Sequence, residues 1–183
     1  LSVVSLVLPL AYPFLPLQLS LLSAATIGTP AFFLALEPNH ERVHGRFISN
    51  VLRAALPGGV TDFLLVFLAQ GFCFAFDLPS DYLGTISTIV VLTVGLLVLW
   101  GVCRPFNTWH WVLWGAMAVI GYGGALLLAP WLGLVKLNLG GVLVLVALLG
   151  LAGPTLFGIS MLNTRIHGAV GEVQDKRRQR RKA

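Results

Sequence analysis

The sequence predicts an all-α protein, a polytopic transmembrane helical bundle. The 183 residues are 57% hydrophobic and only 10% charged, with a mean hydropathy of +0.88. A soluble domain of this length could not bury so much apolar surface. The apolar residues also fall in long uncharged runs, and runs of about 18 or more residues are typical of transmembrane helices. We therefore expect about five full spans, a partial first span and a short cytoplasmic amphipathic helix.

The transmembrane domain is expected to occupy residues 1–162. Residues 1–12 are apolar but too short to cross a bilayer, so we interpret them as the end of a span. The chain begins with Leu1 and has no basic region before this stretch, which argues against a signal peptide and suggests a piece of a longer protein. Five longer apolar runs predict the full spans, at residues 17–36, 59–76, 83–102, 109–129 and 139–162.

The basic residues predict the orientation of the spans. If the six segments alternate in direction, Lys136 falls on one side and the other eleven of the twelve Lys and Arg residues fall on the opposite side. The positive-inside rule makes that basic side cytoplasmic. It includes the cytoplasmic tail, residues 163–183, which ends in "DKRRQRRKA". Attraction to anionic lipid headgroups suits such a tail, but we favour a flexible, solvated segment that fixes topology, and we expect no nucleic-acid partner.

The segment between the second and third apolar runs has its own helical periodicity. In "RFISNVLRAAL", residues 46–56, the apolar side chains form one stripe, with Arg46, Asn50 and Arg53 on the other side. A short amphipathic helix at the membrane surface fits this pattern; docking on another cytoplasmic domain is the alternative. The "PGG" at residues 57–59 is expected to end this helix before the next span.

The same loop contains the spelling H-E-x-x-H. On a helix, His40 and His44 would share one face with Glu41 beside them, as in zinc peptidases that bind a metal and activate water. A working site needs a third ligand, and Asp62 could approach only if the loop bent back. Neighbouring arginines also disfavour a dication. An intramembrane zinc protease is therefore the weakest of the functional hypotheses.

The second run contains a predicted helix break. Pro30 has no N–H for the carbonyl of Thr26, and its ring crowds that turn. Gly28 loosens the same turn, so we expect the helix to kink or unwind near its middle. Membranes tolerate such breaks where they are buried or line a cavity, and transporters use them to bind ions. Ser23 and Thr26 add hydroxyl groups around the break; a kink that only shapes packing is the alternative.

This run, "PLQLSLLSAATIGTPAFFLALEPN", resembles the sixth transmembrane helix of P-type ATPases, the ATP-driven cation pumps, and is most similar to a bacterial branch. The matching residues are Pro16, Gln18, Leu19, Gly28, Pro30 and the turn at Glu37 to Asn39. The resemblance implies that the chain runs from the end of helix five through helix ten. It further implies a bacterial plasma membrane, a cytoplasmic C-terminus, and membrane lipids and the remaining N-terminal part of the pump as partners.

The resemblance also implies site residues. The chain would contribute part of the ion pathway and its helical support, with Ser23 and Thr26 on the transported-cation pathway and the helix break at Gly28 and Pro30. Animal-type calcium pumps carry Asn, Thr and Asp where this chain has Ser23, Thr26 and Ile27, so that only Thr26 agrees. We expect no carboxylate near the centre of any span. The transported cation is therefore open, with calcium and magnesium both possible.

Catalytic parts of a pump are missing from the sequence. The 183 residues contain no D-K-T-G motif, so this chain cannot carry out the phosphorylation. We expect no catalytic residue and no cofactor in it; ATP and Mg would belong to the parent pump. The later spans would pack through small residues, namely Gly121 with Ala125 and Ala147 with Gly150. The alternative function is a stand-alone small channel or an accessory membrane subunit.

Overall fold

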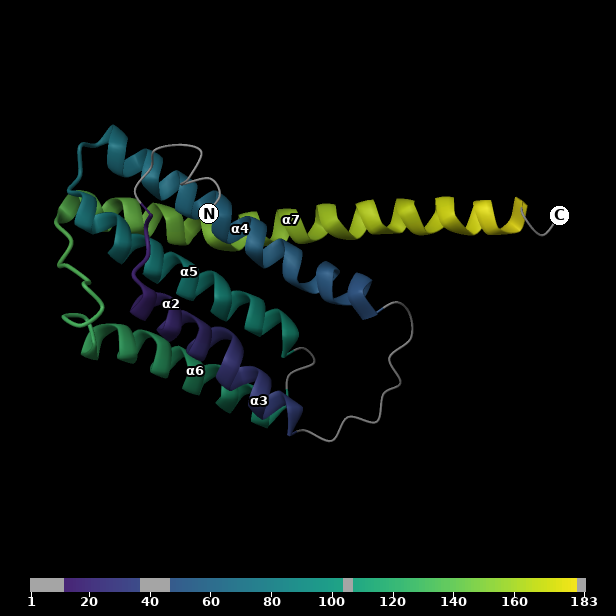
Figure 1. Ribbon diagram of the computed structural model, residues 1–183, viewed down its shortest axis with the longest axis horizontal. Coiled ribbons are helices and arrows are strands. Elements are labelled where there is room, and N and C mark those ends of the chain that lie inside the picture. Colours follow the sequence, from purple (N-terminus) through teal and green to yellow (C-terminus); the bar gives the residue numbers. More distant parts are fainter. Residues whose placement is uncertain (1–11, 37–46, 104–106, 181–183) are drawn as a thin grey trace.

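The computed structural model is a bundle of long helices lying side by side (Figure 1). It describes residues 12–36, 47–103 and 107–180, without the side chains of 47–54 and 166–180. Within these ranges every regular element is helical. The elements are α2 (Pro16–Ser23), the π-helical turn η1 (Ala24–Gly28), α3 (Thr29–Ala35), α4 (Phe47–Ala75), α5 (Ser80–Val102), α6 (Thr108–Leu127) and α7 (Leu139–Arg180).

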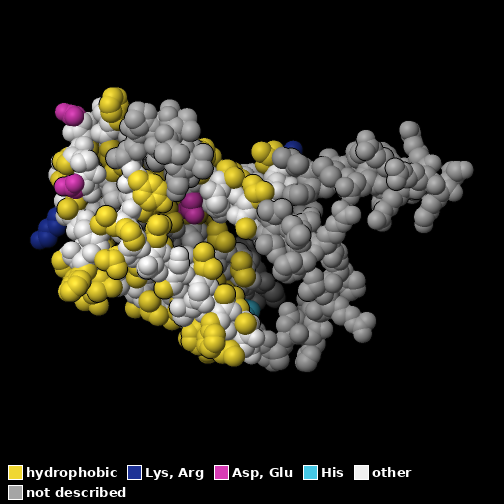
Figure 2. Space-filling view, in the orientation of Figure 1, with side chains coloured by type: hydrophobic (Ala, Val, Ile, Leu, Met, Phe, Trp, Pro, Cys, Tyr) yellow, Lys and Arg dark blue, Asp and Glu magenta, His cyan; other side chains and the backbone are white. Residues whose placement is uncertain are grey.

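Five helical segments are long and apolar enough to cross a membrane. They are Pro16–Ala35, Ala55–Ala75, Ser80–Val102, Thr108–Leu127 and Leu139–Arg165. Much of their apolar surface faces outward: Phe74 is 90% exposed and Leu127 is 82% exposed. On the face shown in Figure 2, many hydrophobic side chains and few charged ones are visible among the described residues. The prediction of an all-α bundle with five full spans is confirmed, while the partial span at residues 1–12 lies almost entirely outside the described residues.

The helices alternate in direction. The α4–α5 and α6–α7 connections and the start of α2 lie at one end of the bundle (Figure 1). The ends of α3 and α5 and the start of α4 lie at the other end, toward which α7 also runs. At the end of the bundle where α2 starts, the side chain of Gln18 links two segments. Its Nε2 donates to Leu132 O (2.8 Å) and its Oε1 accepts from Leu15 N (3.0 Å). Its buried amide is therefore used to hold α2 against the segment after α6.

The predicted helix break at residues 57–59 is wrong. Helix α4 continues through Pro57, which lies inside it, and residues 47–56 form its first turns instead of a separate amphipathic helix. The cause is packing: a Cβ on Gly58 would lie 2.9 Å from Cγ2 of Val98, so α4 and α5 are in close contact at the predicted break. Tertiary packing of this kind overrides the low helix propensity of Pro and Gly.

Helix α5 is the centre of the bundle, since it contacts α2, η1, α4, α6 and α7. One core cluster joins it to α2, η1 and α6 through residues such as Ala25, Leu92 and Met117. A second cluster joins it to α4 and α7 through residues such as Leu65 and Leu148. Every displacement of α5 would therefore disturb both halves of the bundle.

Only one of the two predicted small-residue pairs packs between helices. Gly121 and Ala125 are buried, and a Cβ on Gly121 would lie 2.8 Å from Cδ1 of Leu92. Ala147 and Gly150 are instead exposed on α7. Helix α7 continues beyond the predicted end of the span at residue 162 as far as Arg180. Most of the predicted basic tail is thus a helical extension.

Candidate functional site

The predicted irregularity in the first described span is a π-helical turn. The N–H of Thr29 donates to the carbonyl of Ala24, five residues back, instead of to that of Ala25. Pro30 has no N–H to donate to Thr26. The carbonyls of Ala25 and Thr26 therefore lose the donors that a regular α-helix would supply. Such π-turns within helices occur frequently at functional sites.

The turn is widened and not unwound. Gly28 has helical dihedral angles, φ −63° and ψ −58°, and α3 follows without interruption. A Cβ on Gly28 would make only an ordinary contact, 3.5 Å from Ser23 O. Glycine is therefore not required here by the backbone, and the missing N–H of Pro30 is the stronger local cause of the π-turn. Sequence reasoning identified the carbonyl of Thr26, but that of Ala25 follows only from the hydrogen-bond register.

The two predicted hydroxyl ligands occupy different environments. Thr26 is half-buried, and its Oγ1 donates to Leu22 O at 2.7 Å. Since the hydroxyl proton is used within the helix, the oxygen lone pairs remain to accept a hydrogen bond or a cation. Ser23, one turn earlier, is exposed. The structure therefore brings Thr26 into the bundle and leaves Ser23 on its surface.

A carboxylate lies nearer the middle of a span than expected. Asp62 belongs to the segment Ala55–Ala75, because α4 continues through Pro57 and the span begins earlier than predicted. Its Oδ1 is buried and has no hydrogen-bond partner among the described residues. The predicted span at residues 59–76 left Asp62 near its edge, and counting one membrane-length helix back from Ala75 would have placed it nearer the middle. The hydroxyls of Ser87 and Thr88 on α5 are likewise buried without a partner in the described part of the chain.

Asp62 and Thr26 lie at about the same level of the bundle. Gly58 of α4 packs on Val98 of α5, and Asp62 lies about one helical turn after Gly58, in the direction of the α4–α5 connection. Helices α4 and α5 are antiparallel. One turn from Val98 toward the same connection therefore leads back along α5 to Gly95. A Cβ on Gly95 would lie 2.5 Å from Cγ2 of Thr26, so Thr26 packs directly on this glycine. Two independent helix contacts thus place Asp62 and Thr26 beside the same turn of α5.

Asp62 also lies on the appropriate face of α4. Four residues before it, Gly58 packs on α5. Four residues after it, Val66 belongs to the core cluster that includes Ala25 of η1 and Leu92 of α5. Residues four apart share a helix face. The carboxylate of Asp62 therefore lies on the face of α4 that adjoins α5.

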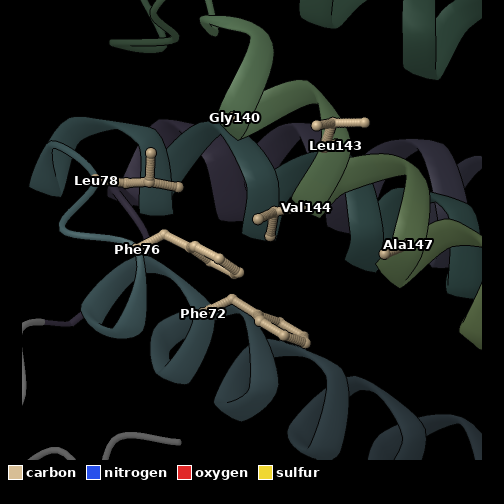
Figure 3. A pocket seen from close by; sticks show the side chains of 7 residues that line it. All are labelled: Phe72, Phe76, Leu78, Gly140, Leu143, Val144 and Ala147. Atoms are coloured by element: carbon tan, nitrogen blue, oxygen red, sulfur yellow. The ribbon is translucent and has the colours of Figure 1, made fainter.

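A cavity elsewhere in the bundle has a different chemistry. It has a volume of about 390 Å³ and lies between α4 and α7, where Phe72 of α4 and Phe76, directly after the end of α4, extend side by side (Figure 3). The lining residues are Phe72, Phe76, Leu78, Gly140, Leu143, Val144 and Ala147. This surface offers no charged or hydroxyl side chain to a cation and suits an apolar group such as a lipid acyl chain.

The described residues contain no group of three or more His, Cys, Asp or Glu side chains that could hold a metal ion. The H-E-x-x-H motif at residues 40–44 lies outside the described residues, as does the turn at residues 37–39. The zinc-protease hypothesis therefore stays a prediction from the sequence.

Curated relatives of the chain are ATPases. The calcium-transporting ATPase CtpE of Mycolicibacterium smegmatis is 34% identical over 118 residues, which are 62% of this chain and 15% of that protein. The calcium-transporting ATPase CtpE of Mycobacterium tuberculosis is 33% identical over 109 residues, 57% of this chain and 14% of that protein. The probable cation-transporting ATPase exp7 of Streptococcus pneumoniae is 26% identical over 104 residues, 57% of this chain and 13% of that protein.

These matches confirm the predicted resemblance: the homologues are cation-transporting P-type ATPases. The matched segment spans only 13 to 15% of the length of these relatives. No protein-family model matches the chain, and no solved structure matches it.

Proposed function

We propose that this chain, a homologue of cation-transporting P-type ATPases, is the membrane-embedded C-terminal part of an ATP-driven pump. In the intact pump it contributes part of the ion pathway and its helical support. Calcium is the transported cation that we propose, because relatives of the chain are named calcium-transporting. ATP and Mg act in the remaining N-terminal part of the pump. The intact pump lies in the bacterial plasma membrane.

The π-turn η1 carries this proposal. It lies in the segment that resembles the sixth helix of these pumps, and it frees the carbonyls of Ala25 and Thr26 from their α-helical donors. Hard cations such as Ca²⁺ take several oxygen ligands, including backbone carbonyls. The carbonyls and the Oγ1 of Thr26 offer oxygens of this kind. Ser23 offers a second hydroxyl, which the remaining part of the pump would cover.

The support is supplied by α5 and α6. Thr26 packs on Gly95 of α5, and Ala25 lies 3.5 Å from where a Cβ on Gly121 of α6 would be. These two glycines let η1 approach both helices closely, and they leave no room for a side chain. We infer that α5 and α6 hold the widened turn in place while the cation binds and leaves.

Thr26→Val in the full-length pump is expected to weaken the apparent calcium affinity about tenfold, equivalent to about 1.4 kcal/mol. Valine keeps the shape and the contact with Gly95 but removes the oxygen. ATP-driven calcium uptake into inside-out vesicles measures the effect. Thr155→Val on α7 is the matched control, because the Thr155 hydroxyl also donates to the carbonyl four residues back, at 2.7 Å.

Unchanged calcium affinity in Thr26→Val would remove Thr26 from the pathway. Calcium flux through this chain without ATP would contradict the pump and favour the stand-alone channel.

The basic residues predict a cytoplasmic C-terminus for the proposed pump. Lys136 is exposed in the α6–α7 connection, at one end of the bundle, and Arg165 belongs to α7, which runs from there toward the other end. In a cysteine-free background, Lys136→Cys should react with an impermeant maleimide added to intact cells, and Gln179→Cys should react only after the cells are opened. The reverse pattern would overturn the orientation.

A further inference from the structure

Asp62 is a half-buried acid that the proposed function leaves unexplained. Its Oδ1 is buried with no hydrogen-bond partner among the described residues. Lys and Arg are represented among the described side chains by Lys136, in the α6–α7 connection, and by Arg165, the last residue of the segment Leu139–Arg165. Neither of them hydrogen-bonds the buried Oδ1 of Asp62. An unpaired carboxylate inside a membrane is costly, and such residues usually mark ion or proton pathways. Its charge must therefore be neutralised by a proton or by a bound cation, and not by a described side chain.

We propose that Asp62 is the carboxylate ligand of a calcium site located between η1, α4 and α5. This inference deepens the proposed function and rests on it. The site combines the carboxylate of Asp62 with the Oγ1 of Thr26 and the carbonyls of Ala25 and Thr26. A hard cation suits such a ligand set, which joins negative charge to several neutral oxygens.

The geometry brings the two sides of this site together at Gly95. Thr26 approaches this residue from η1, with its Cγ2 2.5 Å from where a Cβ would be. Asp62 reaches the same level from α4, one turn from the contact of Gly58 with Val98. The absence of a side chain on Gly95 thus lets the polar groups of η1 and α4 face the same turn of α5.

Thr88 adds a further polar group on α5, away from the level of Gly95. It lies seven residues before Gly95 on α5, on the same face and about 10 Å along the helix axis. Its Oγ1 is buried and makes no hydrogen bond within the described part of the chain. A free hydroxyl along this face gives a departing or arriving cation an oxygen between Asp62 and the end of the bundle that carries the α4–α5 connection.

An apolar carbodiimide tests the proposal without relying on transport. Dicyclohexylcarbodiimide adds to protonated carboxyl groups in apolar surroundings, and the acyl group then migrates to nitrogen as a stable adduct, with no leaving group. In vesicles containing the full-length protein, mass spectrometry should find this adduct on Asp62. Calcium at about ten times its dissociation constant should lower the labelling rate about tenfold, because the bound cation displaces the proton.

Variants of Asp62 distinguish a calcium ligand from an acid that has only a structural role. Asp62→Asn keeps the side-chain shape, and it should abolish the adduct and lower calcium affinity at least about tenfold. Asp81→Asn, at the exposed start of α5, is the matched control and should change neither. Asp62→Glu, which keeps the charge, should retain calcium protection of the labelled carboxyl and so guards against a folding defect in the amide variant.

Three results would overturn the proposal: no adduct on Asp62 at any pH, labelling that depends on pH but not on calcium, or normal calcium affinity in Asp62→Asn. The second result would identify a proton-binding or structural acid. If Thr26→Val weakens transport while Asp62→Asn does not, this inference fails and the proposed function stands. If the unmodified protein transports no cation, the proposed function itself fails.

Discussion

Gly95→Ala is expected to destabilise the bundle by about 1–3 kcal/mol, the usual cost of overpacking a core, and to abolish most transport. The new Cβ would lie 2.5 Å from Cγ2 and 2.8 Å from Cβ of Thr26. A threonine in a helix has few alternative rotamers, and its Cβ cannot rotate away. The clash must therefore push η1 away from α5, which separates Thr26 from the level of Asp62.

The melting temperature of the purified protein and the rate of calcium uptake in vesicles measure these two effects. Gly123→Ala on α6 is the matched control, because a Cβ there would meet nothing within 4 Å. Thr26→Ser removes the methyl group that makes the shortest contact, so the double variant Gly95→Ala/Thr26→Ser should recover part of the lost stability. Equal melting temperatures for Gly95→Ala and the control would show that η1 and α5 are not packed as described.

Local sequence patterns predicted the number of full spans correctly. Long apolar runs are independent of neighbouring helices, because lipid selects them by length and composition. The prediction failed at Pro57, where propensity indicated a break and the contact of Gly58 with Val98 keeps α4 continuous. That single error also misplaced Asp62, since a span that begins at residue 59 leaves this carboxylate near its edge.

The candidate site was only partly predictable for a related reason. Pro30 identifies the disturbed turn from the sequence, since its missing N–H affects its own helix. The choice between an unwound segment and a π-turn depends on how the helix packs on α5 and α6. Gly95 and Gly121 control that packing from distant positions. No periodicity in the sequence indicates that a glycine on one helix faces a threonine on another.

The double variant Gly28→Ala/Pro30→Ala is expected to regularise the helix and to reduce calcium transport at least about tenfold. Alanine at position 30 restores an N–H that can bond the carbonyl of Thr26. Alanine at position 28 fits, because its Cβ would lie 3.5 Å from Ser23 O, and it is up to about 1 kcal/mol more favourable than glycine in a helix. Since Pro30 is fully buried, lost ring contacts oppose these gains and stability should change little.

Transport should fall although the fold is retained, because the cation loses carbonyl ligands that become engaged in the helix. Calcium uptake, calcium affinity and amide hydrogen exchange across residues 24–30 measure the change, with slower exchange expected in the variant. Pro154→Ala is the matched control, since Pro154 also lies inside a helix, is exposed, and gains the same N–H. A double variant with normal uptake and unchanged calcium affinity would mean that the π-turn serves packing alone, and that the cation takes its oxygens from elsewhere.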